Sequence, residues 1–341
     1  MNILNWWHRH GDDANKAQTA ENINEAVERI VTMYPRLWLT RRYRARLAPA
    51  VATSLNYARD IVASIPASRE ASAAKWFSDP CLRAFFAYPD DMARAFSSST
   101  DLRAFLDRNA DIPEAYAVLG MEMVERHVLG VTMEGEVIRR DVPQTAVSFG
   151  NYRVRICGRT EPDLRQEIER RIIDQLALAG LAMVADEKSR RDKLEQERAL
   201  LKTRLRFLER QCTGMRAALG GDAIDGKTEQ ARLQAQFEEN TRNLDSLGKR
   251  TEVLDHALER LRKVLAEPVQ HIYITSKHLR LDRMNIVLKV NSPQAGEDIE
   301  FLIARIPDNP PQMRTFALVR IPRAVMQPEN LQLDEAARRL L

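Results

Sequence analysis

Two leucine-rich heptad runs, one on each side of a glycine-rich turn, constrain this chain more than any other feature. Before the turn, the candidate core positions alternate between spacings of three and four residues: Leu194, Arg198, Leu201, Leu205, Leu208, Cys212, Met215 and Leu219. Seven of these eight residues are apolar. This spacing is typical of a helix that buries a narrow stripe against a partner helix.

The second run repeats the pattern after the turn. Its core positions are Leu233, Phe237, Asn240, Leu244, Leu247, Thr251, Leu254, Leu258, Leu261 and Leu265, of which eight are apolar. The turn begins at Gly220 and Gly221, and glycine readily ends a helix. Helices joined this closely run antiparallel, so the sequence predicts a long coiled-coil hairpin over residues 161–267. A symmetrical pairing places Asn240 near Leu208.

The segment before the heptads predicts helices. Residues 16–128 carry apolar residues at helical spacing, as in the set Tyr116, Leu119 and Met123, and this favours an N-terminal helical bundle. Helix starts are expected where a capping residue precedes a proline. Two such places are Ser78-Asp79-Pro80 and Asp111-Ile112-Pro113.

The flanks of the hairpin predict strands instead. Residues 129–160 and 268–325 contain β-branched, alternating runs, which indicate a small, mostly antiparallel β unit. Gly150 and Asn151 are expected to form a two-residue turn between two strands. Because strand-like runs lie on both sides of the hairpin, we expect the hairpin to be inserted into this unit. The expected fold class is α+β and mainly α, with tails at residues 1–15 and 326–341.

The composition indicates a chain with a packed core and a slight excess of positive charge. Hydrophobic residues make up 44% of the chain and the net charge is +4, so an acidic partner would be tolerated. The three cysteines, Cys81, Cys157 and Cys212, show neither zinc-ligand spacing nor a disulfide framework, which favours a reducing compartment. The chain has no signal-like start and no apolar stretch of membrane length. We therefore expect a cytoplasmic protein without a transmembrane segment.

Residues 221–228, with the sequence GDAIDGKT, match the nucleotide-binding pattern GxxxxGK[ST]. Such a loop needs a buried strand in front of it, so that backbone N–H groups converge on the phosphates. Here heptad helix precedes the loop, and Asp222 and Asp225 would add negative charge where a phosphate must sit. We therefore interpret the pattern as a chance match within a hairpin turn.

A basic run contains five arginines and no acid: Arg36, Arg41, Arg42, Arg44 and Arg46. Leu39, Tyr43 and Leu47 recur every four residues, so on a single helix the arginines would surround one apolar stripe. Guanidinium groups suit phosphate and Trp38 could add stacking, so nucleic acid or an anionic surface is a candidate partner. The favoured interpretation is a solvated helix face whose arginines pair with acids elsewhere.

The N-terminal tail carries an apolar segment, with Trp6 and Trp7 beside Ile3 and Leu4. Tryptophan favours the membrane interface, but a short segment is a weak anchor, so docking on the protein itself or on a partner is the favoured interpretation. The scattered histidines and carboxylates show neither metal-ligand spacing nor a nucleophile–base pair. We predict no catalytic residue, no metal site and no cofactor.

These features predict a non-enzymatic scaffold or assembly protein. It would bind protein partners and form homo-oligomers through the hairpin. Between residues 186 and 216 the outgoing helix carries ten basic residues against six acids, which favours an acidic partner. The alternative is a nucleic-acid-associated protein that binds the phosphate backbone through Arg36–Arg46.

Overall fold

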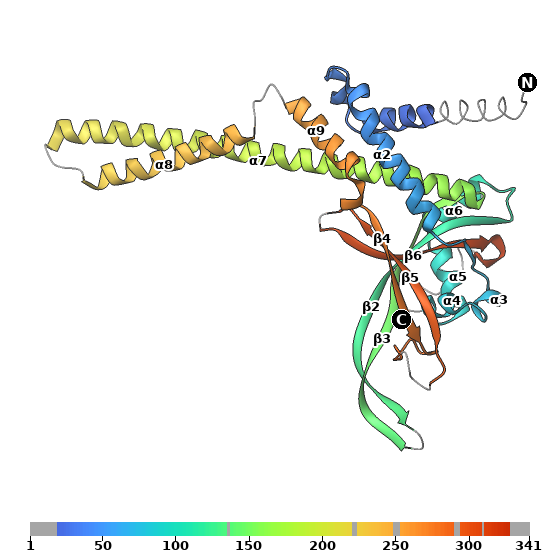
Figure 1. The fold of residues 1–341 in the computed structure, drawn as a ribbon. Helices are drawn as coiled ribbons and strands as arrows, with labels where there is room; N and C mark the ends of the chain where they lie inside the picture. The colour runs from blue at the N-terminus through green and yellow to red at the C-terminus, as the bar shows by residue number, and fades with distance from the viewer. Residues whose placement is uncertain are drawn as a thin grey trace, which may run out of the picture. The chain divides into compact units, whose positions relative to one another are not determined.

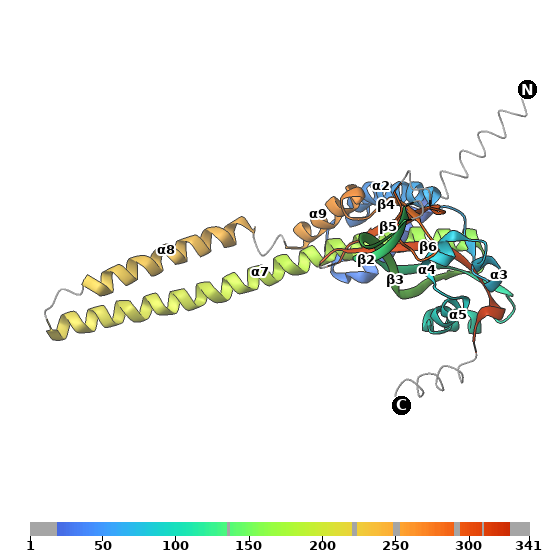
Figure 2. The same cartoon turned by 90° about the horizontal axis from the view of Figure 1, so that it is seen from below.

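The computed structural model describes residues 19–134, 137–219, 224–247, 253–289, 294–308 and 310–327. Its fold is mixed α+β and mainly helical (Figures 1 and 2), which confirms the expected class. The chain divides into two compact units. Residues 1–52 and 177–266 form the first, which we term the helical unit, and residues 53–176 and 267–341 form the sheet unit.

The sheet unit contains a six-stranded sheet in which the order of the main path is β3-β2-β6-β5-β4. All neighbours on this path are antiparallel, and the two-residue β1 pairs parallel with β6. The strands are β1 (Arg69–Glu70), β2 (Glu114–Glu134), β3 (Val137–Gly158), β4 (Tyr273–Leu281), β5 (Glu297–Ile306) and β6 (Gln312–Pro322). The expected antiparallel sheet, with strands that precede and follow the heptad region in sequence, is therefore confirmed.

Backbone pairing continues from one edge of this sheet to the other. Ile286 forms an antiparallel bridge with Ala146 of β3, and Val287 forms one with Leu281 of β4. The Val287 amide donates to Thr145 O at 2.8 Å, and the Leu288 amide donates to Arg280 O at 2.8 Å. The segment after β4 thus satisfies backbone groups of both edge strands, which would otherwise stay unpaired.

Short helices pack against the sheet and close its core. They are α3 (Ala73–Trp76), α4 (Pro80–Phe85), α5 (Pro89–Ser97) and α6 (Thr100–Arg108). The predicted start of α4 is confirmed, because the Asp79 carboxylate accepts from the amides of Cys81 and Leu82. Aromatic side chains fill the space between helices and strands, with Phe301 touching Phe85 and Phe149 at ring-centroid distances of 5.8 and 5.1 Å.

Three expectations for this region were wrong. The helix start expected at Asp111-Ile112-Pro113 is not found, because a strand follows these residues directly. Residues 114–128 are not helical, because β2 begins at Glu114 and pairs with β6 along residues 114–121 and with β3 along its length. Gly150 and Asn151 do not form a hairpin turn but lie inside β3. There the pairing shifts register, and Asn151 adopts a positive φ of 50°. The residue types that suit a tight turn also suit a β-bulge, and here they form the bulge.

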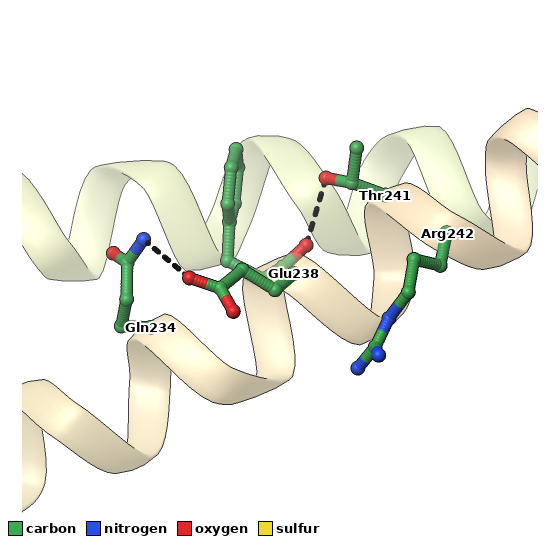
Figure 3. A pocket seen from close by; sticks show the side chains of 5 residues that line it. Gln234, Glu238, Thr241 and Arg242 are labelled. Carbon is green, nitrogen blue, oxygen red and sulfur yellow. Dashed lines mark hydrogen bonds between the residues drawn. The ribbon is translucent and has the colours of Figure 1, made fainter.

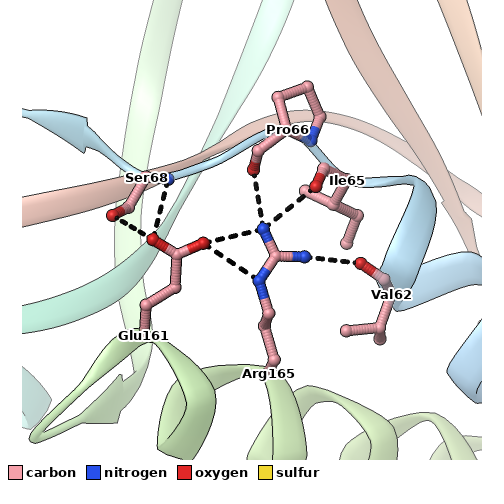
Figure 4. Close-up of polar contacts among 6 residues, drawn as sticks. All are labelled: Val62, Ile65, Pro66, Ser68, Glu161 and Arg165. Atoms are coloured by element: carbon pink, nitrogen blue, oxygen red, sulfur yellow. Dashed lines mark hydrogen bonds and ion pairs between the residues drawn. The ribbon is translucent and has the colours of Figure 1, made fainter.

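An arginine–carboxylate network joins three segments of the sheet unit (Figure 4). Arg165 donates to the carbonyls of Val62, Ile65 and Pro66 at 2.7, 3.0 and 3.0 Å. These carbonyls lie at the end of α2 (Tyr43–Ser64), where helical acceptors have no intrahelical donor. Glu161 accepts from Arg165 and from the Ser68 hydroxyl, both at 2.8 Å. The pair thereby connects α2, the following loop and the start of α7.

The helical unit contains residues 19–33 as a helix, the 3-10 helix η1 (Pro35–Leu39), and parts of α2 and α7. The helices of the heptad region are α7 (Glu161–Leu219), α8 (Ile224–Ser246) and α9 (Val253–Ala266). Both views show α8 alongside α7 (Figures 1 and 2). Arg191 donates to Leu247 O while Asn240 Nδ2 donates to Glu197 Oε2 at 3.0 Å, so the two helices run antiparallel.

The return arm is two helices rather than one. Residues 248–252, between α8 and α9, lie outside the described residues. Asn240 bonds to Glu197 and does not face Leu208, eleven residues farther along α7 (208 − 197), so the symmetrical register was wrong. Glu187 of α7 pairs with Arg260 of α9 at 2.5 Å. The pairing of α8 with α7 and the pairing of α9 with α7 therefore follow different registers, so no single register describes the whole return arm.

Candidate anion-binding surface

The 3-10 helix η1 exposes the aromatic and basic side chains of the predicted site. In a 3-10 helix, residues three apart lie on the same face. Leu37 and Thr40 are both buried, whereas Trp38 and Leu39 are 63% and 60% exposed. The face that carries Leu37 and Thr40 therefore points into the protein, and the side chains of Arg36, Trp38 and Leu39 are exposed to solvent. The Thr40 hydroxyl is buried and has no hydrogen-bond partner within the part of the chain that the structure describes.

The basic run does not lie on one helix, so the predicted arrangement around a single apolar stripe was wrong. Thr40 is extended and Arg42 has a left-handed φ of 57°, so the chain reverses between η1 and α2. The reversal separates Leu39, which is exposed, from Leu47, which is buried. Helical spacing in the sequence could not show this break, because no residue of the run forbids a helix by itself.

The five arginines fall into two groups. Arg46 donates to Asp255 and Glu259 of α9 at 2.5 and 2.7 Å, and Arg44 pairs with Glu28 at 2.5 Å. These two therefore match the favoured interpretation of a paired helix face. Arg36, Arg41 and Arg42 are exposed, and within the described ranges none of them forms an ion pair with a carboxylate.

The start of α2 adds to the positive potential of the second group. The first turn of α2 contains no acidic residue, although the partial positive charge of a helix N-terminus favours one. The Arg46 amide donates to Arg42 O at 3.2 Å, so Arg42 lies directly at this helix end. Because arginines rather than acids occupy this position, the positive charge of the helix end is not neutralised. Such a position suits an anion with several oxygen acceptors.

The structure also contains a shallow hollow of about 370 Å³ on α8, lined by Gln234, Phe237, Glu238, Thr241 and Arg242 (Figure 3). The polar groups there are used locally: Gln234 donates to Glu238 at 3.2 Å, and the Thr241 hydroxyl donates to Phe237 O at 2.8 Å. The hollow is formed by neighbouring turns of one helix, and its polar groups do not converge on a common point.

The nucleotide-binding pattern does not lie wholly in a turn: α7 ends at Leu219, and residues 224–228 of the pattern belong to α8, which begins at Ile224. Residues 220–223 lie outside the described residues, as do Trp6, Trp7 and the C-terminal segment 328–341. Two cysteines are free thiols in the sheet unit. Burial raises the pKa of the Cys81 thiol to about 11 and that of Cys157 to about 12, so both stay protonated near neutral pH.

Within the described ranges, no group of three or more His, Cys, Asp or Glu side chains lies close enough to hold a metal ion. Over the same ranges, none of the helices has the length and apolar character needed to cross a bilayer. No protein-family model matches the chain, and neither the curated proteins nor the solved structures include a significant match.

Proposed function

We propose that the protein is a non-enzymatic scaffold or assembly protein, in which α7 and α8 form a coiled-coil hairpin that docks a second copy of the chain. The observation that carries this proposal is an uncovered apolar pair on α7. Leu200 and Phe207 are 52% and 61% exposed and lie seven residues apart, so they share one face. The stripe that contacts α8 is a different one, with Leu201 and Leu205 buried against Leu233.

Charge complementarity supports a second copy as the occupant. The outgoing helix carries ten basic residues against six acids between residues 186 and 216. Between residues 229 and 246, α8 carries four acids (Glu229, Glu238, Glu239 and Asp245) against two arginines. The basic segment of one α7 thus suits the acidic segment of another copy's α8, and the exposed apolar pair lies within the basic segment.

Light scattering after size exclusion tests the proposal. Leu200→Ser combined with Phe207→Ser should convert an oligomer into a monomer while circular dichroism stays unchanged. Leu129→Ser is the control, because Leu129 is also exposed, at 70%, but lies on β2. A wild-type monomer, an oligomer that survives the double substitution, or one that only Leu129→Ser dissociates would each contradict the proposal.

A deletion tests the same arm as a whole. Arg191 contacts the Leu247 carbonyl, so the chain can be rejoined there by replacing residues 192–247 with a short glycine linker. This deletion keeps α9, whose Asp255 and Glu259 hold Arg46. We expect a folded monomer; retention of the oligomer would exclude the hairpin as the docking arm.

A further inference from the structure

We propose that the η1 surface, formed by Arg36, Trp38, Leu39, Arg41 and Arg42, binds anionic phospholipid headgroups at a membrane surface. This inference is independent of the proposed docking arm, since the two surfaces share no residue. It rests on three observations: uncompensated positive charge, exposed apolar side chains beside it, and a rigid base beneath both.

The charge is placed where a phosphate can neutralise it. Arg36, Arg41 and Arg42 are exposed, and no described carboxylate pairs with them. Two of them precede the acid-free first turn of α2, where backbone N–H groups have no intrahelical acceptor. A phosphate oxygen can accept from both the guanidinium groups and these amides. Basic residues near an anionic leaflet each strengthen binding.

The apolar side chains select a lipid rather than a nucleic acid. Trp38 alone would suit either partner, because its ring stacks on bases and also favours the membrane interface. Leu39 is adjacent and equally exposed, and an aliphatic side chain can neither donate a hydrogen bond to a phosphate nor stack on a base as an aromatic ring does. In a bilayer it reaches the boundary of the acyl chains. A basic cluster combined with an apolar insertion supplies the two signals that stable surface binding requires.

The base of the surface is held firmly, so binding does not require refolding. Leu37 and Leu47 are fully buried on either side of the chain reversal. Arg46 ties the first turns of α2 to α9 through Asp255 and Glu259. Trp38 and Leu39 therefore project from a fixed support, and little conformational entropy is lost when they insert.

Vesicle co-sedimentation of the full-length protein tests the inference. The protein should sediment with vesicles of phosphatidylcholine that contain about 30% of the anionic lipid phosphatidylglycerol. It should stay in the supernatant when the vesicles are pure phosphatidylcholine. Arg41→Ala with Arg42→Ala should weaken binding about 25-fold, since each arginine contributes roughly fivefold. Trp38→Ala with Leu39→Ser should weaken binding at constant charge, and it should remove the share of the tryptophan quenching by brominated lipid that Trp38 contributes, although Trp6, Trp7 and Trp76 remain.

The matched control is Arg283→Ala with Met284→Ser, another exposed arginine beside an exposed apolar residue, located in the sheet unit. It should bind vesicles like the wild type, and so should Leu200→Ser with Phe207→Ser, which separates this test from that of the docking arm. Three results would overturn the inference: no vesicle binding by the wild type, equal loss with the control, or binding to a double-stranded oligonucleotide with none to vesicles. The last result would identify the surface as a nucleic-acid site.

Discussion

The core of the sheet unit and the contact between α7 and α8 bury their apolar side chains to different extents. The core is packed from both sides, whereas the helix contact is packed from one side only. In the sheet unit, Phe301 lies between the sheet and the short helices and is 1% exposed, in contact with two further phenylalanines. The α7–α8 contact buries one stripe, Leu201, Leu205 and Leu233, while Phe207 on α7 stays exposed. A two-sided core uses its apolar surface internally, whereas a one-sided contact leaves apolar surface for a partner.

The largest effect is expected from truncating the two phenylalanines that represent these regions. Phe301→Ala should lower the free energy of unfolding by about 3–5 kcal/mol, because it leaves a cavity that the surrounding rings cannot fill. Phe207→Ala should change it by less than about 0.5 kcal/mol in the monomer, since an exposed residue loses little on truncation. Urea denaturation followed by circular dichroism measures both, and equal losses would break the comparison.

A smaller loss is expected for Arg165→Met in the sheet unit. The substitution leaves the carbonyls of Ile65 and Pro66 without the Arg165 donor, leaves the Val62 carbonyl with the Ile65 amide alone, and removes the cation beside Glu161, at a cost of about 2–3 kcal/mol. Arg171→Met is the control, because Arg171 is exposed and its one carboxylate partner among the described residues is Glu167 on the same helix; its expected cost is at most about 0.5 kcal/mol. If both variants unfold at the same urea concentration, Arg165 does not stabilise the end of α2.

Asn240→Leu should stabilise the α7–α8 contact by about 1 kcal/mol. Asn240 is buried and its Oδ1 has no described partner, whereas Glu197, which accepts from its Nδ2, is exposed and stays hydrated without it. Hydrogen exchange should slow in α8 and stay constant in β5 and β6. Asn240→Ala, which removes the amide without filling its space, should give no such protection; slower exchange in Asn240→Ala as well, or unchanged exchange in Asn240→Leu, would contradict this account.

The smallest effect is a pH dependence in the helical unit. Hydrogen bonds from Arg46 and then Arg262 hold the pKa of Glu259 below its ordinary value. A depressed carboxyl pKa stabilises the fold above the pKa of the unfolded chain, and this contribution is lost as the pH falls through the folded value. Because Glu259 is half exposed, the contribution is about 0.5 kcal/mol. Thermal unfolding between pH 7 and pH 3 should therefore change slightly less in Glu259→Gln than in the wild type; an identical change would exclude the contribution.

Residues whose local pattern and tertiary environment agree could be assigned from the sequence. Asp79 before Pro80 predicted the start of α4, and the β-branched runs within residues 268–325 predicted strands where β5 and β6 lie. At the candidate site, the arginines and Trp38 were recognised by residue type. The exposure of Leu39 was missed, because its spacing to Leu47 fits a buried helical stripe as well as it fits an exposed position.

By itself, the sequence determined the mixed class, the helices of the heptad region and the antiparallel strands that flank it, since periodicity and capping are local properties. Tertiary structure decided whether Tyr116, Leu119 and Met123 would be helix or strand, because their spacing allows both and pairing with β6 and β3 favours the strand. It also decided that Asn151 forms a bulge and that the basic run bends at Arg42. Each of these outcomes depends on backbone partners far along the chain, which no local window contains.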